Sequence, residues 1–284
     1  MANSDATATT TTTAVFIPVR LSSTRLPFKA LRKIQGKPCI QHLVERVRRS
    51  QKIGPVVLCT TLNPADDELM DVADKLGIKY FRGSEVDILE RYRQAARAFG
   101  IRNIVNVDGD DIFCEPAFID ATSAALNSGE PAPDCILWKD APLGSSPVGI
   151  KVEALEKVCS LKDASNTETG WPRFFTETGL FRVVYMRPDD PELRNTGIRL
   201  TLDYEDDLLL FEKIYDNLQE PFSLKDIVRL LRSKPELLKL NEGLSDIYMQ
   251  NFNRKAVKVK LKGVSSTSGS DDDGTAAVDA ARRQ

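Results

Sequence analysis

The sequence is short of features that mark several common classes of protein. It has one histidine, His42, so a Ser-His-Asp triad could form only there, and no neighbouring pattern supports one. We expect His42 on the surface of a helix or at a helix cap. The five cysteines are odd in number and contain no CxxC pair, which argues against zinc and a disulfide framework and fits a reducing cytoplasm.

Long apolar runs and a strong net charge are also missing. No run approaches the ~20 apolar residues that a membrane-spanning helix needs. The net charge is −2, so no global positive field recruits nucleic acid. Residues 1–13 lack the basic start and apolar core of a secretory signal, and we predict a disordered leader there. Residues 263–284 are predicted to be a disordered tail, which leaves one domain at 14–262.

Strands and helices alternate along the first half of the domain. Short apolar runs predict strands at 14–19, 56–60, 78–81 and 103–107, with helices at 38–50, 63–76 and 84–99 between them. Helical connections of this length favour a mostly parallel sheet. The second half is less regular. It predicts strands at 134–138, 148–152, 181–186 and 198–202, and helices at 203–218, 223–233 and 235–240.

A basic loop follows the first predicted strand. Arg20, Arg25 and Lys29 lie within ten positions, with the hydroxyls of Ser22 and Ser23 between them. Arginine offers a planar fork to phosphate oxygens, and lysine offers a mobile point charge. Ligands of parallel sheets bind outside the carboxyl ends of the strands, so this loop is a candidate nucleoside triphosphate site. A solvated basic loop is the alternative on charge alone.

Acidic residues follow two later strands. Asp108, Asp110 and Asp111 come after the strand at 103–107, and Asp203 comes after the predicted strand at 198–202. Carboxylates facing a basic loop suit Mg²⁺, which takes oxygen ligands from one or two carboxylates, phosphates and water. Alternatives remain at each position, because Asp108 and Asp111 could be turn residues and Asp203 could only cap the helix that follows.

These segments together resemble the CMP-sugar cytidylyltransferases, in particular the spore-coat polysaccharide branch, with the 3-deoxy-manno-octulosonate (KDO) cytidylyltransferases as relatives. The family's opening motif is (I/P)xARxxSTRLPxK, and residues 17–29 read IPVRLSSTRLPFK. Further matches, in the same order as in the family, occur at 36–38, 60–67, 81–89 and 200–208. The resemblance extends from about residue 13 to about residue 217.

The resemblance implies a three-layer α/β/α fold of the nucleotide-diphospho-sugar transferase (glycosyltransferase-A) type. It implies transfer of CMP from CTP to a small acidic acceptor, with release of pyrophosphate and with Mg²⁺ as cofactor. Carried over by position, the triphosphate would bind Arg20, Ser22, Ser23, Arg25 and Lys29, and Mg²⁺ would bind Asp110 and Asp203. The residues expected near the nucleotide or the acceptor are Arg82, Ser84 and Asp87.

Departures from the family pattern concern mainly the acceptor. Asp108 replaces Gln or Thr and could be a base, a metal ligand or an acceptor contact, and Phe28 replaces a common Gly. Arg173 could clamp an acceptor carboxylate or phosphate, or form a surface salt bridge. The acceptor could be a keto-sugar acid, a phosphonate or a phosphate. Relatives commonly form homodimers, and residues 245–262 could serve that purpose or pack on their own subunit.

Two other functions stay open at this point. A sugar-phosphate nucleotidyltransferase using another base usually begins with a Gly-rich loop, which is absent here. A noncatalytic nucleotide-binding protein of the same fold is expected to lose an acidic residue or an opening cation, and this chain retains them all.

Overall fold

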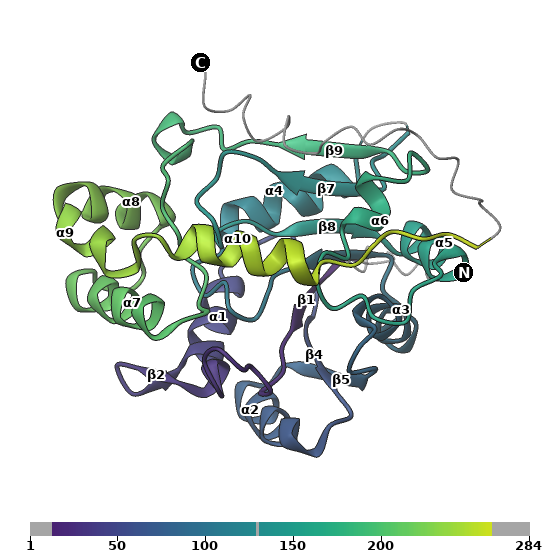
Figure 1. Ribbon diagram of the computed structural model, residues 1–284, viewed down its shortest axis with the longest axis horizontal. Coiled ribbons are helices and arrows are strands. Elements are labelled where there is room, and N and C mark those ends of the chain that lie inside the picture. The colour runs from purple at the N-terminus through teal and green to yellow at the C-terminus, as the bar shows by residue number, and fades with distance from the viewer. Residues whose placement is uncertain (1–12, 129–130, 263–284) are drawn as a thin grey trace, which may run out of the picture.

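A seven-stranded sheet forms the centre of the computed structural model, which describes residues 13–128 and 131–262 (Figure 1). The strand order is β5 (Lys79–Gly83), β4 (Val56–Thr61), β1 (Thr13–Pro18), β6 (Asn103–Asn106), β8 (Val148–Lys151), β7 (Cys135–Trp138) and β9 (Val183–Met186). Only β8 runs against its neighbours, and every other pairing is parallel. The predicted mostly parallel α/β sheet is confirmed.

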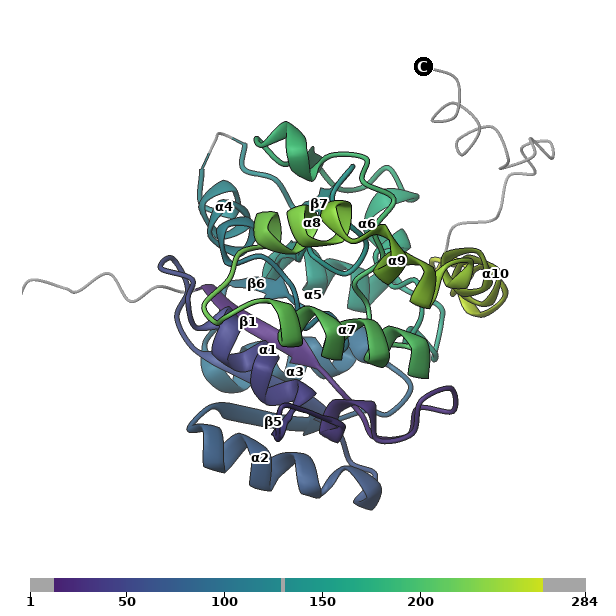
Figure 2. The ribbon, with the colours of Figure 1, turned by 90° about the vertical axis from the view of Figure 1, so that its left-hand side faces the viewer.

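Helices cover both faces of this sheet, because its strands carry apolar side chains on both sides. Along β1, Val15 and Ile17 point into one core, and Ala14 and Phe16 point into the other. Five helices pack on the first face (Figure 2), namely α1 (Cys39–Val47), α2 (Glu68–Leu76), α4 (Pro116–Leu126), α7 (Glu205–Asn217) and α8 (Leu224–Ser233). The second face carries α3 (Ile88–Phe99), α5 (Val152–Leu161) and α6 (Arg173–Thr176).

The remaining elements of the described part of the chain are short, apart from α10. A small hairpin joins β2 (Lys33–Ile34) to β3 (Lys37–Pro38). The remaining helices are η1 (Lys29–Leu31), η2 (Pro64–Asp66), η3 (Pro191–Leu193), α9 (Pro235–Leu238), η4 (Lys239–Asn241) and α10 (Leu244–Lys255). None of the described helices has the length and apolar character to cross a membrane.

Local signals in the sequence set several helix ends. The Asn63 side chain accepts a hydrogen bond from the backbone N–H of Ala65, and Asp87 accepts one from that of Glu90 at the start of α3. Gly77 and Gly100 end α2 and α3 in the left-handed conformation, at φ 59° and 64°. A turn of 3₁₀ helix delays α2 until Glu68, and α3 begins at Ile88 rather than at residue 84 as predicted.

Three predictions are wrong. The segment 198–202 is not a strand. Only Arg199 pairs, in an isolated β-bridge with Leu143, and the pairing does not continue to Pro142 or Gly144. His42 is buried rather than on the surface, with its Nε2 2.9 Å from the carbonyl oxygen of Ile34 and its ring beside Tyr215. Thr13 is buried in β1 rather than part of a leader; the predicted disorder at 1–12 and 263–284 lies outside the described residues.

Candidate active site

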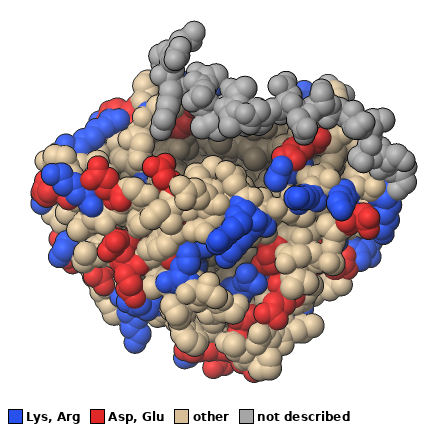
Figure 3. All heavy atoms as spheres, viewed as in Figure 1, with Lys and Arg blue, Asp and Glu red and all other residues tan. Residues whose placement is uncertain are grey.

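A cavity of about 620 Å³ opens at the carboxyl ends of β1 and β6. The loop after β1 forms one wall, and the acidic turn after β6 forms the floor. Predicted site residues that line it are Arg20, Ser22, Ser23, Arg25, Lys29, Asp108, Asp110 and Asp203. Basic side chains gather near the middle of this face of the molecule, close to the end of α10 (Figure 3). The cavity therefore collects the basic and acidic motifs that the sequence singled out.

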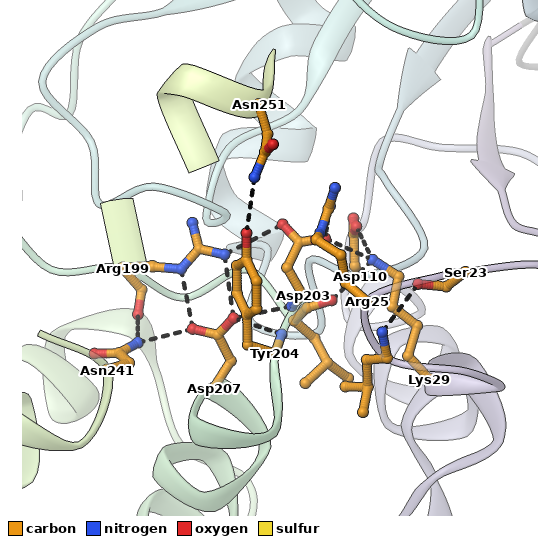
Figure 4. A network of polar contacts seen from close by, with 12 residues as sticks. Ser23, Arg25, Lys29, Asp110, Arg199, Asp203, Tyr204, Asp207, Asn241 and Asn251 are labelled. Carbon is orange, nitrogen blue, oxygen red and sulfur yellow. Dashed lines mark hydrogen bonds and ion pairs between the residues drawn. The ribbon is translucent and has the colours of Figure 1, made fainter. Parts of the chain in front are cut away.

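Lys29 lies between the two acidic segments (Figure 4). Its Nζ donates to Oδ2 of Asp110 at 2.5 Å, to Oδ1 of Asp203 at 3.0 Å and to the carbonyl oxygen of Leu202 at 2.8 Å. A backbone bond from Leu202 N–H to the carbonyl oxygen of Asp110, 2.9 Å long, joins the same segments. Asp110 and Asp203, remote in sequence, are thus held against one ammonium group.

Two arginines, Arg25 and the buried Arg199, hold the Asp203 carboxylate from its other sides. Arg25 donates to Oδ1 at 2.5 Å and Arg199 to Oδ2 at 3.2 Å, and the Asp203 side chain is only 2% exposed. Burial alone would raise the pKa of this carboxyl, but Lys29 and Arg25 outweigh burial and lower it to about 2. Asp207 fixes the positions of both residues, because it accepts hydrogen bonds from the Arg199 side chain and from the backbone N–H of Asp203.

The acidic turn after β6 brings three carboxylates together. One oxygen from each of Asp108, Asp110 and Asp111 lies within 4.8 Å of the others. Desolvation by the surrounding protein and the Asp110 charge raise the pKa of Asp108 to about 6, even though its side chain meets solvent in the cavity. Burial, followed by the charges of Asp110 and Asp108, raises the pKa of Asp111 well above its usual range. This all-oxygen donor set fits a hard divalent cation.

Gly109 allows the acidic turn to approach β1. Its N–H donates to the carbonyl oxygen of Pro18 at 3.1 Å, and a Cβ added there would lie 2.7 Å from that oxygen. Any larger residue would push the turn away from the end of β1. Glycine at position 109 is therefore a steric requirement of the Asp-Gly-Asp turn.

Four predicted residues do not line the cavity. Arg82 bonds the backbone carbonyls of Thr61 and Asn63, at 2.8 and 3.0 Å, and so braces the end of β4. The remaining three make structural contacts of their own: Ser84 accepts from the N–H of Asp87, Asp87 accepts from Lys162 and Thr167, and Arg173 pairs with Glu177 and the carbonyl oxygen of Val257.

Other cavity residues were missed at the sequence level. Arg91 is 2% exposed and donates to Glu168 at 2.7 Å, forming a buried ion pair beneath the cavity. The helix α10 contributes Tyr248, Asn251, Phe252 and Lys255 to the lining. Asp111, noted in the sequence without being assigned to the site, also lines the cavity. No periodic signal pointed to α10, because none of its residues is buried.

The fold and the site are those of an enzyme of the nucleotidyltransferase class, with a basic loop and carboxylates at the carboxyl edge of a mostly parallel sheet. Residues 14–170, more than half of the chain, match the cytidylyltransferase family. The chain belongs to that family, as the resemblance noted in its sequence predicted.

Two known proteins are similar in sequence over most of the chain. The uncharacterized protein MJ1063 of Methanocaldococcus jannaschii is 30% identical over 80% of this chain and 93% of its own length. The spore coat polysaccharide biosynthesis protein SpsF of Bacillus subtilis is 26% identical over 78% of this chain and 94% of its own.

Solved structures share the fold. A cytidylyltransferase from Leptospira borgpetersenii superposes with a TM-score of 0.73 at 23% identity, covering 80% of this chain and 96% of that one. A CMP:2-keto-3-deoxy-manno-octonic acid synthetase solved with CTP gives a TM-score of 0.55 at 16% identity, covering 72% and 98%. The expected nucleotide-diphospho-sugar transferase fold is confirmed.

Proposed function

We propose that this enzyme transfers CMP from CTP to a small acidic acceptor, releases pyrophosphate and uses Mg²⁺. The observation that carries the proposal is the meeting of Asp110 and Asp203, within 3.0 Å of one ammonium group, beside a loop of cations and hydroxyls. The choice of CTP draws on membership of the cytidylyltransferase family and on the similar fold solved with CTP.

The reaction is written as a displacement at phosphorus. An oxygen of the acceptor attacks the α-phosphorus of CTP, the bond to the bridging oxygen of the β-phosphate breaks, and pyrophosphate leaves. Arg20 and Arg25 offer donors to the charge that develops on the leaving group, with Ser22 and Ser23 beside them. Asp108 would accept the proton of an acceptor hydroxyl, whereas an ionised phosphonate or phosphate needs no base.

Asp110 and Asp203 would hold the metal ion, with Asp108 next to them. Bound there, Mg²⁺ would screen the phosphates and stabilise charge on the pyrophosphate. The protein's own part is to keep Asp203 ionised and fixed, which the cations around it do. The rest of the cavity would contact the acceptor, and its walls include Trp138, Trp171 and Phe252.

The proposal is tested first by ligand choice. CTP with Mg²⁺ should raise the melting temperature more than UTP, GTP or ATP. Pyrophosphate release is then measured with a 3-deoxy-ulosonic acid, an alkylphosphonate and an alkyl phosphate as acceptors. Stronger stabilisation by another nucleotide would point to a different nucleotidyltransferase, and binding without turnover on any acceptor would favour a noncatalytic nucleotide-binding protein.

The metal assignment is tested in the same assay. Asp110→Ala should reduce Mg²⁺-dependent pyrophosphate release at least about 100-fold while circular dichroism shows an intact fold. Asp74→Ala, an exposed aspartate of α2, is the matched control and should keep wild-type turnover. Near-normal turnover of Asp110→Ala would refute the assignment.

A further inference from the structure

The Lys29 ammonium has no hydrogen-bond donor left for a phosphate. An ammonium carries three N–H groups. In this structure they go to Asp110, to Asp203 and to the carbonyl oxygen of Leu202 (Figure 4). The family resemblance places Lys29 on the triphosphate. Two of its three acceptors are instead carboxylate oxygens from separate segments of the chain, so Lys29 links Asp110 to Asp203 directly.

The surroundings hold this lysine in place. Its side chain is 16% exposed, and that of Asp203 is 2% exposed. Its Nζ lies 2.5 Å from the Asp110 carboxylate and 3.0 Å from that of Asp203, so it forms charge-assisted hydrogen bonds to both. The ammonium thus acts as a fixed counter-ion shared by two carboxylates from separate segments of the chain.

The same two carboxylates are the groups that would bind the divalent cation. A lysine and a metal ion on one pair of carboxylates repel each other, and partial burial strengthens that repulsion compared with water. Arg25 and Arg199 add further positive charge at Asp203. A nucleotide changes this balance, since its triphosphate is an alternative partner for an ammonium on a long flexible stem.

We propose that Lys29 is a positioning residue whose ammonium holds Asp110 and Asp203 together until a divalent cation arrives with the nucleotide and displaces it toward the phosphates. This inference rests on the proposed function, because it takes those carboxylates as the metal ligands. It makes metal binding dependent on CTP: the free protein binds the metal weakly because the lysine already neutralises the site.

The test measures Mn²⁺ binding to the full chain without nucleotide, by electron paramagnetic resonance and by calorimetry. Lys29→Met should bind Mn²⁺ at least about 10-fold more tightly than the wild type, because the carboxylates lose their counter-ion. Mn²⁺ alone should then raise the melting temperature of this variant and leave that of the wild type unchanged. Lys33→Met is the matched control, since Lys33 is exposed in the neighbouring β2 and should keep the wild-type affinity.

Two further variants keep the test decisive. Lys29→Gln retains donors without charge and replaces Lys29→Met if the latter fails to fold, while Lys29→Arg restores charge and should restore weak Mn²⁺ binding. Adding Asp110→Asn to the neutral variant should remove the gained Mn²⁺ affinity, which would show that the ion binds at Asp110. The inference is overturned if the neutral Lys29 variants bind Mn²⁺ no more tightly than the wild type does.

The proposed function is judged separately, from pyrophosphate release by the wild-type enzyme with CTP. If the wild type releases no pyrophosphate with any acceptor, but Lys29→Met binds Mn²⁺ more tightly than the wild type, the proposed function is rejected and the role of Lys29 is kept. Turnover with CTP, together with unchanged Mn²⁺ binding, would reject the role of Lys29 and keep the function.

Discussion

At the scale of single residues, Gly144 shows how closely two backbone segments approach each other beside the cavity. Gly144 lies at φ +85°, and a Cβ there would stand 2.6 Å from the backbone carbonyl of Leu200. That contact aligns the segment leading to Asp203 with the cavity wall, through bonds between Leu143 and the backbone of 198–200. Glycine is therefore required at 144 both for its backbone conformation and for lack of a side chain.

Gly144→Ala should lower the free energy of unfolding by about 3 kcal/mol or more, because it adds a clash to backbone strain. Gly100→Ala is the control for strain alone, since Gly100 has a positive φ of +64° but open space around its missing Cβ. That variant should lose only about 1–2 kcal/mol. Urea unfolding of both proteins measures the difference, and equal losses would show that the contact with Leu200 relaxes at little cost.

At the scale of elements, α10 is a covering helix rather than a core helix. Asn251 donates to the Tyr204 hydroxyl at 3.4 Å, and Tyr248 lies 5.0 Å from the Arg199 guanidinium. After the helix ends, Val257 N–H donates to the carbonyl oxygen of Thr169 at 2.9 Å. The segment 245–262 thus contacts other parts of its own chain, and its part in a dimer stays a prediction, as does the homodimer itself.

Lys255, at the end of α10, brings a cation from the C-terminal part of the chain to the cavity. Lys255→Ala should lower kcat/KM about 10-fold, by weakening a charge-assisted bond to an anionic substrate, with no change in melting temperature because Lys255 is exposed. Steady-state kinetics with CTP and acceptor varied in turn identify which substrate it contacts. Lys258→Ala, exposed on the same segment away from the cavity lining, is the control, and equal kinetics for both variants would exclude this role.

At the scale of the whole molecule, one sheet couples two apolar cores. Neighbouring residues of β1 and β6 enter opposite cores, so neither core can loosen without disturbing the strands that carry the site. The cavity lies at the edge that both cores support. We therefore expect a single cooperative unfolding transition.

Leu43→Ala, in α1 on one face, and Leu89→Ala, in α3 on the other, test this coupling. Both leucines are fully buried, so each change should cost about 2–5 kcal/mol. For each variant, fluorescence and circular dichroism should report the same unfolding midpoint, lowered relative to the wild type. Separate transitions for the two probes would show that the cores unfold independently.

Local physics allowed the sequence to specify much of this enzyme: the strand that ends at the basic loop, the capped helices, the parallel half of the sheet, and the Arg, Lys and Asp residues that line the cavity. Periodicity shows which face of an element is buried, but it does not show which remote segment packs there. The tertiary structure alone decided that Lys29 bonds both Asp110 and Asp203, that Arg82, Asp87 and Arg173 turn to structural partners, and that α10 borders the cavity. Those outcomes depend on contacts between distant parts of the chain, where burial and charge, rather than local propensity, set the partner of each side chain.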